Sequence, residues 1–471
     1  MNDIIAEIIE KKKQDVAIKG YSLGVAIPEK RMRPVNPFMI KKDVILEIKR
    51  ASPSKKNIAE NLNAAETALI YKQNGAGAIS CLTEENYFKG SLHDLMQVCD
   101  AVPDVAVLRK DFLIDEAEIE ISYKCGADAV LLIAGILSIE ELFVMTKKCH
   151  DFGIRAFIEV RTEEDVEKVL KIKNQYADTI VCGVNSRNLK DFSIDLLVPA
   201  MLKNKLGGSV IFESGIETPE AAANIAAMGF TGILLGEFAV RNLQNVNKFV
   251  KAFFSTKENL YGKQMLKLAE KLNKQKTPLI KICGLTQKED VLLADSLGAD
   301  FVGFIFASGF QRNVCGEKFD EIKEILSSVK AFKVAVITDP HSKEAKNAAI
   351  FVKNSVLDFL QFHGIEYEEI PDYMKELPHY FAISSDKTDM LLKQGEPRFL
   401  QDVKTHEYDT SKPLWIAGGI TADNVASLVN EFKPELVDVS SGIENQDKIG
   451  IKNHEKMHRF FNQIQLVVKN E

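Results

Sequence analysis

Short runs of apolar residues, rich in Val and Ile, recur along the whole chain and alternate with longer amphipathic stretches. Continuous apolar runs are typical of strands buried on both faces, and their alternation with helices indicates βαβ units. The first half has such runs at 44–49, 78–82, 105–109, 129–134, 155–160, 179–185, 209–214 and 232–236. The second half has them at 279–283, 300–306, 333–337, 357–362, 380–384, 398–402, 414–419 and 436–441. Because eight such units in about 250 residues form one closed barrel, the sequence predicts an α/β protein of two tandem (β/α)8 barrels.

The stretch 251–278 separates the two sets of runs. It is rich in charged residues, carries Leu at intervals and has no apolar run of strand length. We therefore expect a first barrel over residues 1–255, a helical connector over 256–276 and a second barrel over 277–471.

Charge and composition exclude several classes of protein. The net charge of −7 and the scattered Lys and Arg argue against a nucleic-acid surface. No run of about 18 apolar residues could span a membrane, and Asp3 and Glu7 interrupt the apolar N-terminal positions as in an amphipathic helix rather than a signal peptide. The seven cysteines include no C-x-x-C pair, as in a reducing cytosol. We expect a cytoplasmic monomer that binds neither nucleic acid nor membrane.

Glycines follow the last two strands of each half. The segments 213–222 and 417–426 each end a strand, pass through glycine and open a helix, and 234–237 and 438–442 each place glycine after the next strand. Glycine at this point lets backbone N–H groups approach an anion at a helix N-terminus. The loops after strands 7 and 8 are the usual phosphate site of a barrel. One such loop is compatible with a simple tight turn, but the repetition favours a phosphate site in each barrel.

Polar side chains gather at the carboxyl ends of strands in the first half, where barrel enzymes have their active sites. A single charge at a strand end is common, because the chain must leave the core. Here five strand ends on one rim bring two lysines and three glutamates together, and such clusters perturb pKa values for acid–base work. The residues are Glu47, Lys49, Ser52, Ser54, Lys110, Glu159, Asn185, Arg187, Glu213 and Ser214.

Several segments of the first half resemble indole-3-glycerol phosphate synthase. They are LEIKRASPSK (46–55), TEENYFKGS (83–91), LRKDFLID (108–115), FIEV (157–160), GVNSRNL (183–189) and ESGI (213–216). The resemblance implies that Lys110 is the general acid that protonates the ribulose carbonyl while the anthranilate ring attacks. It implies that Glu159 and Lys49 serve the proton transfers that lead to loss of water, and that Glu47 positions Lys49.

The same resemblance implies a set of substrate-binding residues: Ser52, Ser54, Phe88, Asn185, Arg187, Glu213 and Ser214. Arg187 and the Ser52–Ser54 loop would lie near the carboxylate and phosphate ends of the substrate, and Ser214, Gly215 and Gly236 would hold its phosphate. Lys56 stands where the family usually has Gly, and Ser186 replaces a usual Asn. Neither departure removes a catalytic group.

In the second half, Cys283 ends the first run and Asp402 ends the sixth. A cysteine at a barrel mouth is usually an apolar filler, but it acts as a base where neighbouring dipoles lower its pKa. An acid across the barrel would complete the pair that an aldose–ketose shift needs, with one group taking a proton from carbon and the other protonating the ring oxygen. Such a base requires surroundings that favour the thiolate, because an ordinary thiol is mostly protonated at neutral pH.

KICGLT (281–286), GADFVGFIFA (298–307), IAGGITADNV (416–425) and VDVSSGIE (437–444) resemble phosphoribosylanthranilate isomerase, over about residues 277–471. The resemblance implies Cys283 as general base, Asp402 as general acid and Arg312 as the partner of the anthranilate carboxylate. It implies a phosphate site made of Gly418, Gly419, Ser441 and Gly442. His363 matches a family position to which we assign no role. The usual Gly-rich loop that ends in Phe-Asp-Trp is replaced by VKTHEYDTSKP (403–413), and Arg312 lacks its usual Ser-Pro and Tyr neighbours.

The segment 454–458 spells H-E-x-x-H, a zinc-protease pattern. Catalytic zinc needs a third protein ligand, and no further His or Cys follows within the remaining residues. A solvated face of the last helix explains the motif better. We expect neither a metal nor a cofactor, and the expected partners are phosphorylated anthranilate–sugar substrates.

Three hypotheses follow. The chain is a bifunctional enzyme of tryptophan biosynthesis, or only the first barrel is active and the second is a binding or structural shell, which the missing loop motivates. A different pair of sugar-phosphate barrels, such as those of histidine biosynthesis, would use paired aspartates at strand ends, whereas this chain offers Lys110 and Cys283.

Overall fold

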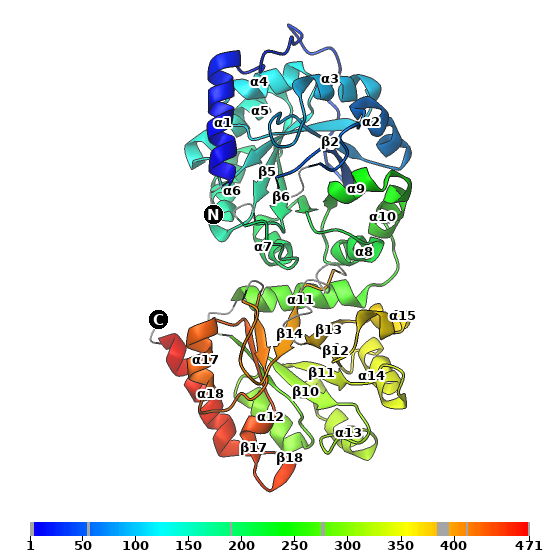
Figure 1. Ribbon diagram of the computed structural model, residues 1–471, viewed down its shortest axis with the longest axis vertical. Helices are drawn as coiled ribbons and strands as arrows, with labels where there is room; N and C mark the ends of the chain where they lie inside the picture. Colours follow the sequence, from blue (N-terminus) through cyan, green and yellow to red (C-terminus); the bar gives the residue numbers. More distant parts are fainter. Residues whose placement is uncertain are drawn as a thin grey trace. The chain divides into compact units, whose positions relative to one another are not determined.

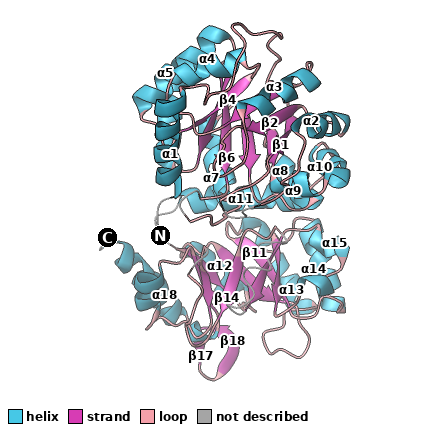
Figure 2. Cartoon of the chain, turned by 45° about the horizontal axis from the view of Figure 1, so that its top comes forward, coloured by secondary structure: helices cyan, strands magenta, loops and turns pink. Residues whose placement is uncertain are grey.

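The computed structural model describes residues 4–53, 57–188, 191–274, 278–383, 395–410 and 413–469. The chain forms two compact units, Met1–Lys257 and Glu258–Glu471. Each unit contains a closed barrel of eight parallel strands surrounded by helices (Figures 1 and 2). The predicted architecture of two tandem (β/α)8 barrels is therefore confirmed. None of the helices in the described part of the chain is long and apolar enough to cross a membrane.

The first barrel closes in chain order, with β1 paired to β8. Its strands are β1 (Asp43–Ile48), β2 (Ala78–Leu82), β3 (Ala106–Lys110), β4 (Ala129–Ile133), β5 (Arg155–Val160), β6 (Ile180–Asn185), β7 (Val210–Glu213) and β8 (Gly232–Leu235). Its helices are α1 (Ile4–Lys19), α2 (Ala64–Gln73), α3 (Leu92–Ala101), α4 (Ala117–Lys124), α5 (Ile139–Phe152), α6 (Glu163–Tyr176), α7 (Val198–Leu206), α8 (Pro219–Ala227), α9 (Glu237–Arg241) and α10 (Val246–Phe253).

The second barrel also closes in chain order, with β9 paired to β16. Its strands are β9 (Leu279–Ile282), β10 (Phe301–Ile305), β11 (Phe332–Ile337), β12 (Phe359–His363), β13 (His379–Ile383), β14 (Phe399–Asp402), β15 (Trp415–Ala417) and β16 (Leu436–Val439). A hairpin of β17 (Glu444–Asn445) and β18 (Lys448–Lys452) follows. The helices are α11 (Leu260–Lys274), α12 (Lys288–Ser296), α13 (Glu317–Lys323), α14 (Lys343–Lys353), α15 (Asp372–Lys375), α17 (Val425–Phe432) and α18 (His454–Lys469).

Helix boundaries follow local capping chemistry. Ser138 and Thr162 begin α5 and α6 with reciprocal capping boxes, in which the N-cap hydroxyl and the third-residue carboxylate each accept a backbone N–H. Gly153 ends α5 in the left-handed region at φ 68°, which costs glycine little. These short-range signals turn the chain back toward the next strand and so keep the strands parallel.

The interior of the first barrel is an apolar layer directly below its mouth. One buried residue from each strand contributes to it: Ile45, Ala78, Leu108, Leu131, Phe157, Val181, Ile211 and Leu234. Alternate residues of a strand point to the same face, so the inward residue that follows Leu108 is Lys110 and the one that follows Ile211 is Glu213. Period-two geometry therefore places the predicted charged residues on an apolar floor.

The helix predicted as a connector, α11, belongs to the second unit. The Tyr261 hydroxyl donates to Glu396 at 3.1 Å, and the Gln264 amide donates to Asp358 at 3.2 Å. Both partners lie just before or at the start of barrel strands. Helix α11 therefore packs at the amino-terminal end of the second barrel's strands.

Candidate active sites

A pocket opens at the carboxyl ends of the first barrel's strands. Most predicted site residues of this half line it, namely Glu47, Lys49, Ser52, Phe88, Lys110, Glu159, Asn185, Arg187, Glu213, Ser214, Gly215 and Gly236. Ser54 lies outside the described residues. Since these residues come from seven strands or the loops after them, the closed barrel brings them to one rim.

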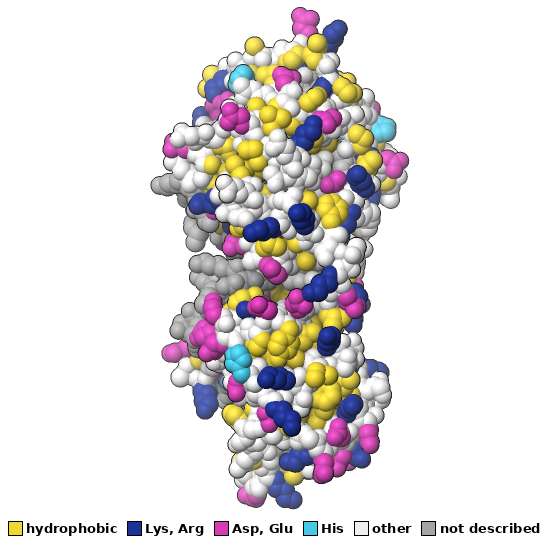
Figure 3. All heavy atoms as spheres, turned by 90° about the vertical axis from the view of Figure 1, so that its right-hand side faces the viewer, with side chains coloured by type: hydrophobic (Ala, Val, Ile, Leu, Met, Phe, Trp, Pro, Cys, Tyr) yellow, Lys and Arg dark blue, Asp and Glu magenta, His cyan; other side chains and the backbone are white. Residues whose placement is uncertain are grey.

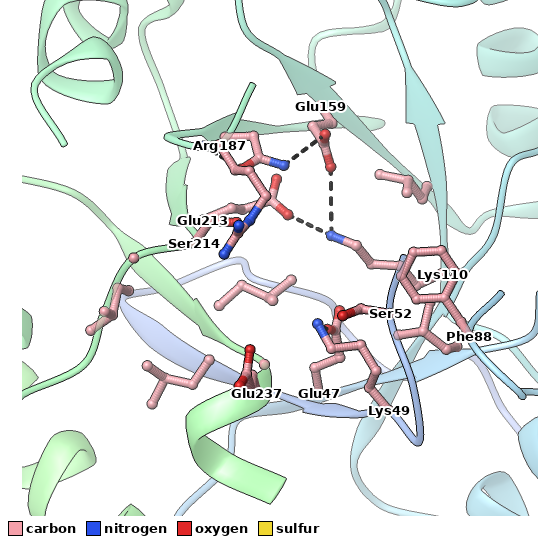
Figure 4. Close-up of a pocket in the computed structure, with 18 of the residues that line it drawn as sticks. Glu47, Lys49, Ser52, Phe88, Lys110, Glu159, Arg187, Glu213, Ser214 and Glu237 are labelled. Carbon is pink, nitrogen blue, oxygen red and sulfur yellow. Dashed lines mark hydrogen bonds and ion pairs between the residues drawn. The ribbon is translucent and has the colours of Figure 1, made fainter. Parts of the chain in front are cut away.

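Lys110 lies at the centre of this pocket and reaches toward two carboxylates (Figure 4). Its Nζ is 2.5 Å from Glu213 Oε2 and 3.6 Å from Glu159 Oε2. Burial disfavours the charged amine, but Glu213, Glu159 and Glu47 outweigh it and raise the pKa of Lys110 above its ordinary value. Lys110 is therefore an ammonium group at neutral pH and can donate a proton.

The carboxylates around Lys110 differ in their protonation. Burial raises the pKa of Glu213 to about 8, and the charge of Glu159 adds to this effect. Burial also acts on Glu47, but Lys49 and Lys110 outweigh it and lower the pKa of Glu47. Lys110 opposes the effect of burial on Glu213. Of these two carboxyl groups, Glu47 is therefore the one that is ionised throughout the neutral range.

Glu213 is packed unusually tightly for a carboxylate. Its Oε1 is buried and has no hydrogen-bond partner in the described part of the chain. A Cβ at Gly183 would lie 2.1 Å from that oxygen, so only glycine leaves room for this carboxylate. In the sequence, Gly183 reads as one more residue of an apolar strand, so its contact with Glu213 could not be predicted.

The other members of the site are fixed by short contacts. Glu47 Oε1 pairs with Lys49 Nζ at 3.0 Å, and the Asn185 amide donates to Glu159 Oε1 at 3.0 Å. Ser214 adopts φ 70°, a sparsely populated conformation for a residue with a side chain. With Gly215 at φ 71°, this turn carries the chain from β7 past the pocket.

The pocket also has walls made of residues that were not among the predicted site residues. They are apolar or aromatic residues on strands and loops, and include Phe112, Leu131, Ile133, Phe192, Ile216 and Phe238. Phe88 and Phe112 lie side by side, with ring centroids 6.2 Å apart. An aromatic substrate ring fits such walls. Apolar residues near strand ends carry no local signal that separates them from the core.

In the second barrel, Cys283 follows β9 and sits above a buried polar layer. Lys281 Nζ is 2.5 Å from Asp438 Oδ2 and 2.9 Å from Gln361 Oε1, which also accepts the Tyr380 hydroxyl at 3.0 Å. Burial raises the pKa of Cys283 although Lys281 opposes this effect. The surroundings that a thiolate base requires are thus only partly present, and the protein alone holds a thiol at neutral pH.

Asp402 ends β14 at the mouth of the same barrel. Its Oδ2 lies 4.0 Å from His363 Nε2, and a Cβ at Gly418 would lie 2.8 Å from its Oδ1. Gly418 and Gly419 both have positive φ, at 92° and 64°. Asp402 therefore lies next to a loop predicted to hold phosphate.

The loop after β14 holds its place without the usual Phe-Asp-Trp sequence. His406, at φ 60°, has its Nε2 3.0 Å from the Gly418 carbonyl oxygen. The Tyr408 hydroxyl donates to the Ala417 carbonyl at 3.1 Å. The loop is thereby tied to the turn after β15, beside Asp402.

Arg312 meets a carboxylate of the protein itself. Its Nε and Nη2 donate to the two oxygens of Glu444 at 2.7 and 2.8 Å. Buried Lys452 donates to Glu444 Oε1 at 3.0 Å and to the Ser440 carbonyl at 3.0 Å. This chain of contacts links Arg312 to the loop that contains Ser441 and Gly442, and it leaves Nη1 as the guanidinium donor directed elsewhere.

The H-E-x-x-H motif lies at the start of α18. His454 Nε2 is 2.9 Å from Asp290, and His458 is exposed. No group of three or more His, Cys, Asp or Glu side chains within the described ranges could hold a metal ion.

Fold and site together define a pair of (β/α)8-barrel enzymes, the first with a lysine–carboxylate site and the second with a thiol and a carboxylate at its mouth. Residues 7–253 match the family model of indole-3-glycerol phosphate synthase, and residues 280–405 and 393–463 match that of N-(5'-phosphoribosyl)anthranilate isomerase. The chain belongs to the indole-3-glycerol phosphate synthase family and carries a second, isomerase-family barrel.

Individual relatives match either the whole chain or one half of it. The tryptophan biosynthesis protein TrpCF of Vibrio parahaemolyticus is 28% identical over 98% of this chain and 94% of its own length. An indole-3-glycerol phosphate synthase of Aliarcobacter butzleri is 34% identical over 50% of this chain and 94% of its own length. The multifunctional tryptophan biosynthesis protein of Schizosaccharomyces pombe is 29% identical over 89% of this chain, which spans 59% of that longer protein.

Proposed function

We propose that this chain catalyses two consecutive steps of tryptophan biosynthesis. The second barrel converts N-(5'-phosphoribosyl)anthranilate to 1-(2-carboxyphenylamino)-1-deoxyribulose 5-phosphate. The first barrel closes the ring of that product, with loss of carbon dioxide and water, to give indole-3-glycerol phosphate. The observation that carries the proposal is the convergence of Lys110, Glu159 and Glu213 in one pocket of a barrel of the synthase family.

In the ring closure, Lys110 donates a proton to the ribulose carbonyl oxygen while the anthranilate ring carbon attacks the carbonyl carbon. Its position between Glu213 and Glu159 keeps it charged until that moment. Departure of carbon dioxide restores the electrons to the ring. Glu159 and Lys49 then move the protons that accompany loss of the hydroxyl as water.

Binding of the same substrate falls to the rest of the rim. Arg187 and Ser52 would face its charged groups, and the turn of Ser214 and Gly215 with Gly236 would hold its phosphate. Glu213 lines the same pocket, and its carboxyl group would bind a substrate hydroxyl or amine.

In the isomerisation, Asp402 protonates the furanose ring oxygen, and the ring opens to an iminium ion. Cys283 removes the proton from the neighbouring carbon, and the resulting enolamine becomes the ketone. Arg312, held by Glu444, would receive the anthranilate carboxylate through its remaining amino group. Gly418, Gly419, Ser441 and Gly442 form the loops proposed to hold phosphate.

The direct test is to supply the purified chain with N-(5'-phosphoribosyl)anthranilate and to follow indole-3-glycerol phosphate. Formation of that product requires both activities. Accumulation of the ribulose intermediate would show that the synthase is inactive, and an unchanged substrate would show the same of the isomerase.

A second barrel that is only a shell is not favoured. Its match to the isomerase model extends over most of the barrel. Cys283 directly follows β9 and Asp402 ends β14, so both residues lie at the carboxyl ends of strands. The replaced loop is anchored by His406 and Tyr408 rather than lost.

A further inference from the structure

Behind the first pocket lies a cluster of four buried charged side chains to which the proposed mechanism gives no role. Lys12 of α1 and Arg109 of β3 face Asp111 and Glu118. The side chains of Arg109, Asp111 and Glu118 have no exposed surface, and that of Lys12 is 5% exposed. Removing four charges from water costs free energy unless each charge is paired with an opposite one. The pairing within this cluster therefore matters for the fold around it.

The cluster is centred on the residue that follows Lys110. Asp111 Oδ2 accepts from Lys12 Nζ at 3.0 Å, from Arg109 Nη2 at 2.8 Å and from the Thr83 hydroxyl at 2.7 Å. Its Oδ1 accepts the backbone N–H of Phe112 at 2.8 Å. Asp111, the residue after Lys110, is therefore fixed through both of its carboxylate oxygens.

The same contacts hold Lys110 itself. Its carbonyl oxygen accepts the backbone N–H of Thr83 at 3.0 Å, and the Thr83 hydroxyl is the one that binds Asp111. Side chains alternate along this segment, so Lys110 points into the barrel while Arg109 and Asp111 point outward to α1 and α4. The contacts that fix Asp111 therefore also fix the backbone from which the Lys110 side chain extends.

Lys12 brings the cluster to neutrality. Two cations then match two carboxylates, and Lys12 Nζ bridges Asp111 at 3.0 Å and Glu118 at 2.9 Å. The charges of these two carboxylates outweigh burial and raise the pKa of Lys12. Without its ammonium group, a negative charge would remain buried one residue from Lys110.

Helix α1 is also held against the loop that follows β2. The Tyr87 hydroxyl donates to Glu7 at 2.6 Å, and the Asn86 amide donates to Asp15 at 3.0 Å. Ile4 and Ile5 pack against the same apolar cluster as Phe88 and Phe112. Contacts of α1 on both sides of Lys12 in the sequence therefore hold this helix in place, and the Lys12 side chain extends from it into the barrel wall.

We propose that Lys12 is a positioning residue for the ring-closure reaction, acting through Asp111 to hold Lys110 in place. The inference rests on the proposed role of Lys110. It makes α1, which precedes the barrel in the chain, a working part of the first active site. The property that matters is the balance of charge around Asp111, rather than the volume of the Lys12 side chain.

The test uses the full chain with Lys12→Met, which keeps the length of the side chain and removes its charge. Lys11→Met is the matched control, because Lys11 lies one position earlier on α1, is half exposed and pairs with Asp15 rather than with the buried cluster. Turnover and KM of ring closure are measured with the ribulose intermediate supplied directly, at a temperature where melting curves show every variant folded. The isomerase rate of each preparation gives an internal standard.

We expect Lys12→Met to lower the kcat of ring closure by about 10- to 100-fold, because displacing a catalytic group by about 1 Å can cost 10²-fold. KM and the isomerase rate should change little, and Lys11→Met should match the unaltered chain. An unchanged kcat, or a raised KM at unchanged kcat, would overturn the proposal, the latter by making α1 a cover for the substrate.

The double variant Lys12→Met, Glu118→Gln restores neutrality and keeps the test decisive if the single variant fails to fold. It should fold and recover much of the lost kcat, whereas a double variant no faster than Lys12→Met, or unfolded like it, contradicts the charge argument. Lys110→Met is measured beside it. If Lys110→Met stays active, the proposed role of Lys110 fails, and that result is separate from the outcome for Lys12.

Discussion

The two barrels share a topology but differ in what lies beneath their mouths. In the first, an apolar layer of residues such as Leu108 and Phe157 lies directly below Lys110 and its carboxylates. In the second, the aromatic rings of Phe301, Phe332, Phe359 and Trp415 pack at the bottom. The buried pair of Lys281 and Asp438 lies between these rings and Cys283.

This difference follows from the kind of group that each mouth holds. The first site balances its charges laterally, across the rim, so an apolar floor strengthens the contact between Lys110 and Glu213 by excluding water. In the second site, burial acts to keep the Cys283 thiol protonated, and the charges of Lys281 and Lys452 act against this effect. A cation placed below Cys283 is the element that favours its thiolate. One fold thus carries its charged groups in different layers of the two barrels.

Charge is mixed on the surface, in contrast to these ordered interiors. On the face drawn in Figure 3, Lys and Arg side chains are interspersed with Asp and Glu over both units. With a net charge of −7, such a surface suits small anionic substrates only where a site concentrates positive groups. The two barrels are therefore distinguished by the residues of their mouths and interiors.

The largest expected effect separates the two activities. Lys110→Ala removes the ammonium group that Glu213 and Glu159 hold in place, and loss of a positioned acid costs about 10²–10⁴-fold in rate. Ring closure should fall by that factor while isomerisation is unchanged, as measured by single-step assays on one preparation. Near-normal ring closure would remove Lys110 from the mechanism.

The second prediction addresses the thiol. Cys283→Ser keeps the shape of the side chain but has a far less acidic hydroxyl, so isomerase turnover should fall about 10²-fold or more for loss of a general base. Asp402→Asn should have a similar effect, because an amide keeps hydrogen bonds but cannot act as an acid. Binding of a reduced substrate analogue should change little in either variant. A Cys283→Ser variant with full turnover would make Cys283 a packing residue and revive the shell hypothesis.

Much of this arrangement could be predicted from the sequence. Strand positions were correct to within about two residues, because long apolar runs leave few alternatives in a parallel barrel. The first pocket was predictable because strand ends converge, which turns separate positions such as Lys49 and Asn185 into neighbours.

The parts that could not be predicted depend on pairing between distant segments. Lys281 and Asp438 each read as a break in an apolar run, and only barrel closure brings them to 2.5 Å. The partner of Arg312 was expected to be the substrate, yet the β17 residue Glu444 occupies two of its donors. The polar residues of α11 form a pattern typical of an exposed helix, so the buried contact of Tyr261 could not be predicted.

The third prediction concerns the space beside Glu213. Gly183→Ala would place a Cβ 2.1 Å from Glu213 Oε1, and the carboxylate must shift away from Lys110. We expect ring closure to slow by about 10- to 100-fold, the cost of misplacing a catalytic group by about 1 Å, with the isomerase unaffected. Gly208→Ala is not a fair control because Gly208 has positive φ, whereas Ala200→Gly on α7 is an ordinary core change in the same unit. If Gly183→Ala is as active as that control, the position of Glu213 is not critical.

The fourth prediction uses pH to contrast the barrels. Cys283 has a raised pKa, so its thiolate fraction should rise about tenfold per pH unit through the neutral range. The residual isomerase kcat/KM of Asp402→Asn should rise with it, because this variant has no acid that loses its proton as the thiolate forms. Lys110, with its raised pKa, stays charged over that range, and the first site should change only near pH 8, where Glu213 loses its proton. In Asp402→Asn the ratio of isomerase to synthase kcat/KM should therefore rise from pH 6 to pH 8. A ratio independent of pH in this variant would mean that the thiolate is not the base.

The smallest expected effect comes from separating the barrels. The chain divides into its two units between Lys257 and Glu258. Helix α11 packs on the second barrel through Tyr261 and Gln264. A fragment of residues 1–257 should keep its synthase rate, and a fragment of 258–471 its isomerase rate, each within about twofold, since each mouth is built from its own unit. A fragment of 277–471 lacks α11 and leaves Glu396 without its buried tyrosine partner, so it should melt at a lower temperature than the 258–471 fragment. Equal melting temperatures of the two fragments would indicate that α11 is only a connector and does not stabilise the second barrel. Loss of either activity from the longer fragments would show that the barrels depend on one another, and the contrast between their interiors would then no longer explain their separate chemistry.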